Sequence, residues 1–350
     1  MKPSLGQLFI VGFDGLSLPN DGRRLLTDFD ACGAILFKRN VESLEQVVLL
    51  NSQIVDMSKS KAIISVDQEG GRVARLGEIC TPVMPMRELA RLHLTKPTLP
   101  FRIAAMIGRE LAALGFHLNF APVVDVDSNP NNPVIGDRAF SSDPKVVAQL
   151  CAEFIAGMQG SGIAACAKHF PGHGDTHADS HLELPVLDHD MKRLEETELL
   201  PFKSAIAANV ASIMTAHILL PQIDDVPATL SQRLLTDVLR NQLKYNGLII
   251  SDDLEMRGIS DHYALQDILV KGLHAGVDLF LICSDTKRAE AAIVEVEKLV
   301  ASGEINPAVI ERAMARVQSF KERTVGTVAQ PDVEYAKTII RSKPHRDLMS

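Results

Sequence analysis

The 350-residue sequence contains no tryptophan and only three tyrosines, so it offers few large aromatic side chains on which nucleic-acid bases or sugar rings could stack. Its 36 basic and 44 acidic residues give a net charge of −8. This argues against a nucleic-acid or anionic-membrane partner, which would require a basic surface. No apolar run approaches the length of a membrane span, and the first fifteen residues lack the pattern of a secretion signal. We therefore expect a cytoplasmic protein.

The five cysteines are scattered, odd in number and never arranged as a C-x-x-C pair. This pattern is unlike a disulfide framework or a zinc site. We expect reduced, buried thiols at Cys32, Cys80, Cys151, Cys166 and Cys283.

Short apolar runs alternate along the chain with longer segments of helical periodicity. Most of the runs are continuously apolar, as in strands that are buried on both faces of a parallel sheet. With 46% hydrophobic residues, the chain can bury a large core. The eight runs cover residues 8–15, 32–38, 62–70, 117–126, 162–170, 211–219, 247–253 and 278–285.

The clearest helical segment is TLSQRLLTDVLRNQLKYNG, residues 229–247. Thr229 and Gln232 have the spacing of a capping box, which predicts a helix that begins at Thr229. Asn246-Gly247 then predicts its end. Further helices are expected at about 43–57, 99–115, 144–160, 190–208, 263–275, 286–302 and 306–322.

Eight strands with interleaved helices predict an α/β fold, a single (β/α)8 TIM-like barrel. We expect it to form one domain over residues 1–350, with a polar C-terminal tail from about 324. A doubly wound open sheet is the alternative. In a barrel the catalytic residues lie at the C-terminal ends of the strands. That position is expected for Asp67, Asp125, Lys168, His169, Asp252 and Asp253.

The segment KHFPGHGDTHADSH, residues 168–181, has a histidine at every fourth position. Such spacing would align the rings on a helix, but Pro171, Gly172 and Gly174 interrupt any helix here. An H-E-x-x-H type zinc helix is therefore excluded, since that motif needs an unbroken helix. A loop could still hold a metal, so a metal-dependent hydrolase on a barrel stays open. The histidines are His169, His173, His177 and His181.

Asp179 stands two residues before His181. In an extended loop the two side chains can lie on the same side, where the carboxylate would fix the tautomer of the imidazole and stabilise its cation. Such a pair can shuttle protons near neutral pH. Gly172 and Gly174 would let the loop swing, so His181 could rest away from the reacting bond without substrate.

The best nucleophile candidate is Asp252 in LIISDDLEM. A carboxylate at a strand end can attack an electrophilic carbon and be released later. The alternative for Asp252 is a helix N-cap, a role that Asp253 fits better. A carboxylate nucleophile with a separate proton shuttle is the arrangement of retaining glycoside hydrolysis, here with a histidine where a second carboxylic acid is usual.

Four motifs, VDQEGGRVARL, NPVIGDRAF, KHFPGHGDTHADSH and SDDLEM, resemble the signatures of bacterial β-N-acetylhexosaminidases of glycoside hydrolase family 3, in the order found there. The resemblance implies that Asp252 is the nucleophile and that His181, assisted by Asp179, is the acid–base. It implies sugar binding by Asp67, Arg75, Arg138, Lys168 and His169.

The resemblance also implies a substrate and a setting. Such enzymes release non-reducing terminal N-acetylglucosamine from muropeptides that carry 1,6-anhydro-N-acetylmuramic acid, during peptidoglycan recycling in the cytoplasm. We expect no cofactor, no metal and a monomer whose only partner is this small amino-sugar substrate. Two other readings stay open, a binding protein for amino sugars and catalysis by the acetamido group of the substrate itself.

Overall fold

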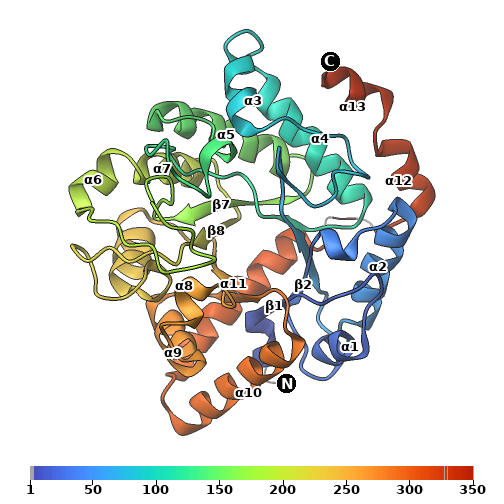
Figure 1. The fold of residues 1–350 in the computed structure, drawn as a ribbon. Helices are drawn as coiled ribbons and strands as arrows, with labels where there is room; N and C mark the ends of the chain where they lie inside the picture. Colours follow the sequence, from blue (N-terminus) through green and yellow to red (C-terminus); the bar gives the residue numbers. More distant parts are fainter. Residues whose placement is uncertain (1–3, 327, 329, 350) are drawn as a thin grey trace.

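Eight parallel strands close into a barrel in the computed structural model, which describes residues 4–326, 328 and 330–349 (Figure 1). The barrel closes because β1 pairs with both β2 and β10. This confirms the predicted barrel and excludes the open sheet. Each strand lies within one of the eight predicted runs: β1 (Phe9–Val11), β2 (Gly33–Leu36), β3 (Ile63–Val66), β6 (Leu118–Asn119), β7 (Ala164–Phe170), β8 (Ser212–Thr215), β9 (Leu248–Asp253) and β10 (Leu279–Ile282).

Helices surround this barrel as an outer ring (Figure 1). Three of the helices given below, α1, α3 and α8, were not predicted from the sequence. The helical elements of the ring are α1 (Asn20–Thr27), α2 (Leu44–Met57), α3 (Met86–His93), α4 (Leu99–Ala113), α5 (Pro144–Gln159), α6 (Met191–Glu196), α7 (Leu199–Ala207), η5 (Arg233–Gln242), α8 (Arg257–Ser260), α9 (Leu265–Ala275), α10 (Thr286–Ser302) and α11 (Pro307–Thr324).

Two predicted helices differ from the observed ones. The helix expected at 190–208 is divided into α6 and α7 at Thr197, which leaves the helical region. Pro201 explains the break, because a proline is tolerated in the first turn of α7 but not inside a longer helix. Thr229 does not begin the next helix. Its hydroxyl group is buried against His217, and Ser231 instead accepts the Leu234 N–H ahead of η5.

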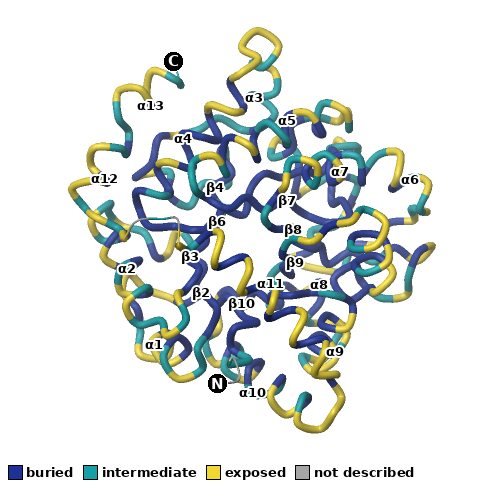
Figure 2. Tube along the Cα trace, turned by 180° about the vertical axis from the view of Figure 1, so that it is seen from behind, coloured by how far each residue is buried: buried dark blue, intermediate teal, exposed yellow. Residues whose placement is uncertain are grey.

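The buried apolar side chains inside the barrel form a cluster separate from the one between strands and helices. Figure 2 shows the strands of the barrel as mostly buried. At one end, Val317 and Phe320 of α11 pack into it. At the other end, Phe120, Met214 and Leu281 of the same layer face a cavity. All five cysteines are free and buried, as predicted.

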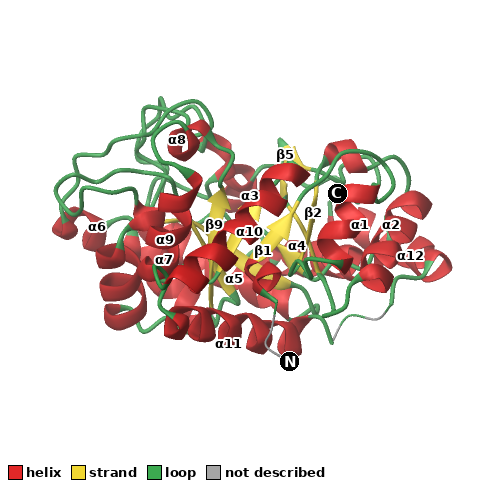
Figure 3. Cartoon of the chain, turned by 90° about the horizontal axis from the view of Figure 1, so that it is seen from below, coloured by secondary structure: helices red, strands yellow, loops and turns green. Residues whose placement is uncertain are grey.

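The long loops gather on the side of the barrel opposite α11 (Figure 3). They include a two-stranded hairpin after β3, formed by β4 (Gln68–Gly70) and β5 (Val73–Ala74). The segment beyond about 324 is not an extended tail, since α12 (Val333–Ile339) and α13 (Lys343–Leu348) pack beside α2 and α4. Within the described ranges we find no helix both long and apolar enough to cross a membrane.

A buried ion-pair triad ties together the barrel end opposite these loops, at the start of β10. Asp278 precedes β10, and its carboxylate lies 2.5 Å from Arg240 of η5 and 2.9 Å from Arg316 of α11. It also accepts the Ile249 N–H of β9. Burial raises the pKa of Asp278, and the two guanidinium groups oppose that rise. Removing this acceptor would leave a largely buried guanidinium without its counter-charge, which is costly.

Substituting Asp278→Asn should therefore lower the free energy of unfolding by about 3 kcal/mol. The matched control is Asp261→Asn, which breaks the exposed Asp261–Arg257 pair and should change the stability little, as is usual for surface pairs. Urea denaturation of the two variants and the parent measures the difference. Equal losses for both variants would show that the triad does not tie the barrel end together.

Candidate active site

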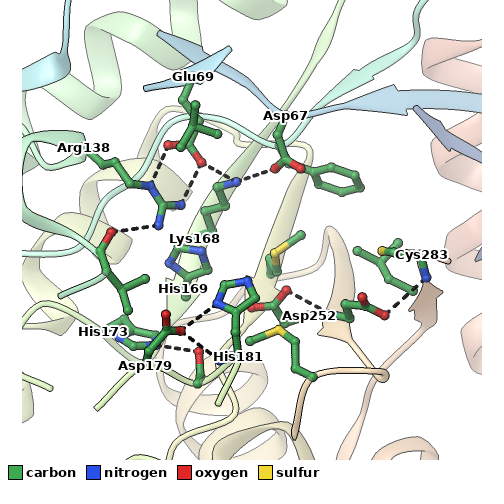
Figure 4. Close-up of a pocket in the computed structure, with 18 of the residues that line it drawn as sticks. Asp67, Glu69, Arg138, Lys168, His169, His173, Asp179, His181, Asp252 and Cys283 are labelled. Carbon is green, nitrogen blue, oxygen red and sulfur yellow. Dashed lines mark hydrogen bonds and ion pairs between the residues drawn. The ribbon is translucent and has the colours of Figure 1, made fainter. Parts of the chain in front are cut away.

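A cavity of about 250 Å³ opens at the C-terminal ends of the strands. The side chains in Figure 4 converge on it from separate loops and strand ends. Its walls are mostly charged, while Phe120, Met214 and Leu281 supply an apolar floor. All eight residues predicted for the site line this one cavity: Asp67, Arg75, Arg138, Lys168, His169, Asp179, His181 and Asp252.

One wall is a network of alternating charges (Figure 4). Lys168, at the end of β7, is only 2% exposed, and its ammonium group lies 2.7 Å from Asp67 and 2.6 Å from Glu69. Glu69 also binds Arg138 through two hydrogen bonds of 2.9 and 2.8 Å. Burial alone would raise the pKa of Glu69, but Arg138 and Lys168 outweigh it and hold that pKa well below its usual range.

Glu69 was missed in the sequence, although it stands two residues after Asp67 in DQEGG. Its acidity alone did not distinguish it from a surface glutamate. Its role depends on Arg138 and Lys168, which lie far away along the chain. With both carboxylates and both cations paired, the wall presents a fixed array of donors and acceptors suited to sugar hydroxyl groups.

Arg75 forms the outer part of the same wall. It follows β5 directly, and its guanidinium lies 3.8 Å from Asp67 and 5.5 Å from the centre of the Phe37 ring. The side chain is about one third exposed. Arg75 can therefore reach a ligand in the cavity while Asp67 and Phe37 restrain its head group.

A second carboxylate orients His169. Asp125 is 1% exposed and accepts hydrogen bonds from His169 Nδ1, at 2.7 Å, and from the N–H groups of His169 and His173. Because a carboxylate only accepts, Nδ1 carries the proton. The sequence placed Asp125 at a strand end but assigned it no function. In the structure it fixes the ring of a predicted sugar-binding residue.

The four histidines of the 168–181 segment have four different environments. The segment is a loop after β7, as predicted, and not a helix. His173 is buried between Thr176 and Ser180, and burial lowers its pKa to about 4. His177 is exposed and contacts Asn129. The regular spacing therefore does not create a shared metal-binding face.

The two glycines of this loop do not act alike. Gly172 has a φ of +139°, a conformation that favours glycine. Gly174 has no such angle, but an added Cβ atom would lie 1.7 Å from the Val126 carbonyl oxygen. Gly174 is therefore required for close packing in this conformation, and the swing of the loop stays a prediction. Asn132 also binds the His173 carbonyl, so any movement must lie beyond this anchored part.

The predicted dyad is formed in the structure. His181 Nδ1 donates to Asp179 at 2.7 Å, and the His181 N–H donates to the same oxygen at 2.9 Å. The His181 side chain is 64% exposed, yet both residues line the cavity (Figure 4). His181 thus lines the same cavity as Asp252 in this structure, and the swing of the loop stays a prediction.

Asp252 lies near the end of β9 and faces the cavity from the opposite wall (Figure 4). It is not a helix N-cap, since α8 begins five residues later. Burial by itself would raise the pKa of Asp252, but His169 and the Asp253 N–H hold it below its usual value. The group is therefore ionised at neutral pH, as a nucleophile requires.

Asp253 has a different role from its neighbour. It accepts the N–H groups of Glu255 and Cys283, so it stabilises the turn after β9 and does not cap α8. Burial raises the pKa of Asp253 to about 7.

His217 was also missed. It is fully buried just after β8, and its Nε2 donates to the Asp253 carbonyl at 3.1 Å while Nδ1 lies 2.8 Å from the Thr229 hydroxyl group. Burial lowers its pKa. It therefore supports the backbone beside Asp252 as a neutral ring.

We examined whether the histidines and carboxylates could hold a metal ion. Within residues 4–326, 328 and 330–349, no three histidine, cysteine, aspartate or glutamate side chains are arranged to do so. The rings of His169 and His173 already bond to Asp125 and to hydroxyl groups. These two rings are therefore already engaged by side chains of the protein.

The sequence is similar to those of known proteins. The Glycosyl hydrolase family 3 N terminal domain matches residues 2–320. β-Hexosaminidase A of Pseudoalteromonas piscicida is 36% identical over 95% of this chain, which spans 60% of that relative's length. The β-hexosaminidase of Nitrosospira multiformis is 37% identical over 84% of each chain.

Solved structures agree. A glycoside hydrolase family 3 β-N-acetylglucosaminidase from Paenibacillus sp. has a TM-score of 0.90 and 37% identity, over 96% of this chain and 67% of the other. NagZ from Neisseria gonorrhoeae, in complex with N-trifluoroacetyl-D-glucosamine, has a TM-score of 0.80 and 29% identity, over 97% and 95%. The match over most of the sequence and the shared barrel show that this chain belongs to glycosyl hydrolase family 3.

Proposed function

We propose that the protein is a retaining β-N-acetylhexosaminidase that releases terminal N-acetylglucosamine. One observation carries the proposal, namely that an ionised strand-end carboxylate, Asp252, and an imidazole–carboxylate dyad, His181–Asp179, line the same cavity. A nucleophile and a proton shuttle on one cavity are what a double displacement at a sugar carbon requires. The relatives named β-hexosaminidase support this choice of sugar.

In the first step Asp252 attacks the anomeric carbon, and the bond to the leaving oxygen breaks. His181 donates a proton to that oxygen as the bond breaks. The imidazolium that begins the step carries a positive charge, which the Asp179 carboxylate stabilises at 2.7 Å. The products of this step are the free leaving group and a glycosyl ester of Asp252.

In the second step water attacks the anomeric carbon of the ester. The neutral His181 takes a proton from that water, and the Asp252 carboxylate leaves. The sugar departs with its original anomeric configuration, and His181 is again protonated. Each group thus ends the cycle in the state in which it began.

Sugar recognition falls to the fixed wall. Asp67 and Glu69 present acceptors, and Lys168, Arg138 and Arg75 present donors. Because the buried members already hold one another, they are ordered before substrate arrives, and binding need not order them. His169, held by Asp125, adds a directed imidazole on the side of Asp252.

We further propose that the natural substrates are muropeptides carrying 1,6-anhydro-N-acetylmuramic acid, cleaved in the cytoplasm during peptidoglycan recycling. The support is the family resemblance of the four motifs, together with a similar structure that holds an N-acylglucosamine. The acidic surface, with a net charge of −8, fits a soluble sugar substrate better than a polyanion.

The first test is a panel of 4-nitrophenyl glycosides assayed with and without a chelator. We expect turnover of the N-acetyl-β-glucosaminide, little turnover of the β-glucoside, and no loss after exhaustive chelation. Absence of turnover on the whole panel would favour a binding protein. Loss on chelation that zinc restores would favour the metal-dependent hydrolase.

Intermediate trapping tests the role of Asp252. A slow fluorinated N-acetylglucosaminide should leave a covalent sugar on the peptide that contains Asp252, detected by mass spectrometry. Asp252→Asn should abolish labelling and lower kcat on the order of 10³-fold or more. The neighbouring control Asp253→Asn should still be labelled at residue 252. An unlabelled but active parent enzyme would mean that the acetamido group is the nucleophile.

Leaving-group dependence tests His181. His181→Ala should slow substrates with poor leaving groups by roughly 10²- to 10⁴-fold, and activated aryl glycosides far less, because these need little protonation. His177→Ala, an exposed histidine of the same loop, should affect neither class. Equal losses on both classes for His181→Ala would contradict its role as the acid.

A further inference from the structure

The C-terminal segment 333–348 lies outside the part of the chain that matches the family domain, which ends at residue 320. Its helices α12 and α13 run along the outer surface past α2 and α4 (Figure 1). Between the two helices, the chain reaches the turn that follows the sugar-binding hairpin. Arg341 forms hydrogen bonds with that turn.

Arg341 donates hydrogen bonds to three carbonyl oxygens of a single turn. Its Nε binds the Cys80 oxygen at 2.9 Å, and one terminal nitrogen binds the oxygens of Gly77 and Glu78 at 3.1 and 2.8 Å. The turn is helical, since the N–H groups of Ile79 and Cys80 donate to the Leu76 carbonyl. Carbonyls at the end of such a turn lack donors within it, and the Arg341 guanidinium provides the missing donors.

Arg341 is itself held in an uncommon conformation. Its φ is +50°, in the left-handed region that few residues other than glycine adopt. Glu110 of α4, which is 2% exposed, accepts the Arg341 N–H at 3.0 Å and His345 Nδ1 at 2.8 Å. The same carboxylate accepts both the N–H and the hydroxyl group of Thr81, the residue that ends the turn. The strained backbone conformation of Arg341 is therefore imposed by the contacts around it, since such conformations persist only where surrounding contacts hold them.

The turn connects this anchor to the cavity. Arg75 precedes it directly and lines the cavity wall. At the same end, the Leu76 N–H donates to Gln68 at 3.0 Å and the Arg75 N–H to the Asp67 carbonyl at 3.4 Å. The turn is thus fixed at one end by the hairpin and at the other by Arg341. Glu110 also holds Thr81 at that end, and Leu76, Ile79 and Cys80 of the turn are buried in the core. The ion pair of Lys38 with Glu78 is exposed and contributes little.

We propose that Arg341 is a positioning residue for the sugar site. By holding the Leu76–Cys80 turn, it fixes the backbone from which Arg75 extends, so a segment beyond the family domain completes the wall of the substrate pocket. This inference deepens the proposed function and rests on it for the choice of substrate. The contacts of Arg341 themselves do not depend on that function.

Steady-state kinetics on the aryl N-acetylglucosaminide test the proposal. Arg341→Ala should raise KM about tenfold while kcat changes less than about twofold, because Arg75 contributes to binding and a loosened wall misplaces it. Arg341→Lys keeps the charge but not the fork that bridges three carbonyls, so it should raise KM by less. The control is Lys337→Ala, which removes exposed pairs of α12 with Glu45 and Glu334 and leaves the turn untouched.

A double-mutant cycle separates positioning from general stabilisation. In the background Arg75→Ala, adding Arg341→Ala should raise KM no further, since the side chain through which Arg341 acts is gone. An equal tenfold rise in both backgrounds would overturn the proposal, as would an unchanged KM in Arg341→Ala alone.

Hydrogen exchange gives a readout that does not depend on activity. Peptides that cover 73–80 should exchange faster in Arg341→Ala, and in the milder Arg341→Lys should Arg341→Ala fail to fold, but not in Lys337→Ala. Unchanged exchange in this region would overturn the proposal even if the parent enzyme is active. If the parent turns over no glycoside of the panel, the proposed function fails, and the exchange result still decides whether Arg341 holds the turn.

Discussion

The need to pair every charge at the barrel mouth is the constraint on which the site depends. An unpaired ammonium group buried like that of Lys168 would be costly, and Asp67 and Glu69 remove this cost at 2.7 and 2.6 Å. Glu69 in turn needs Arg138, which comes from a loop far along the chain. Because no member can move without leaving a partner unpaired, the network fixes the relative positions of β7, the hairpin after β3 and the Arg138 loop.

This rigidity contrasts with the other half of the site. The wall of paired charges is buried, whereas the His181–Asp179 dyad is largely exposed and is connected to the barrel by the anchored part of its loop. The division suits the two tasks that we propose for these halves. Sugar recognition benefits from groups that are ordered in advance, and a proton shuttle that serves first the leaving group and then water needs access to both. Asp252 lies on β9 between these halves, and its carboxylate accepts a hydrogen bond from the Asp253 N–H.

The sequence predicted the barrel well because buried parallel strands leave a strong mark, a continuous apolar run, and all eight runs contain a strand. It predicted the residues of the cavity because polar residues that directly follow a buried apolar strand are expected to lie at the mouth of the barrel. It could not reveal Glu69 and Asp125 as functional, since their roles depend on partners 44 to 99 residues distant. The prediction that a helix begins at Thr229 was wrong for the same reason, because the hydroxyl group of Thr229 contacts the distant His217 and does not cap a helix.

Arg341, in the C-terminal segment, likewise depends on partners that are distant along the chain. Nothing in its local sequence marks it, as RSKPHR is a polar stretch near the chain end. Its significance arises only when α12 and α13 bring it against the turn after Arg75. The residues proposed to perform the chemistry, Asp252 and the dyad, lie within the part that matches the family domain, while Arg341, the proposed support of the binding wall, lies outside it. Binding strength can therefore change through the C-terminal segment while the nucleophile and the proton shuttle stay the same.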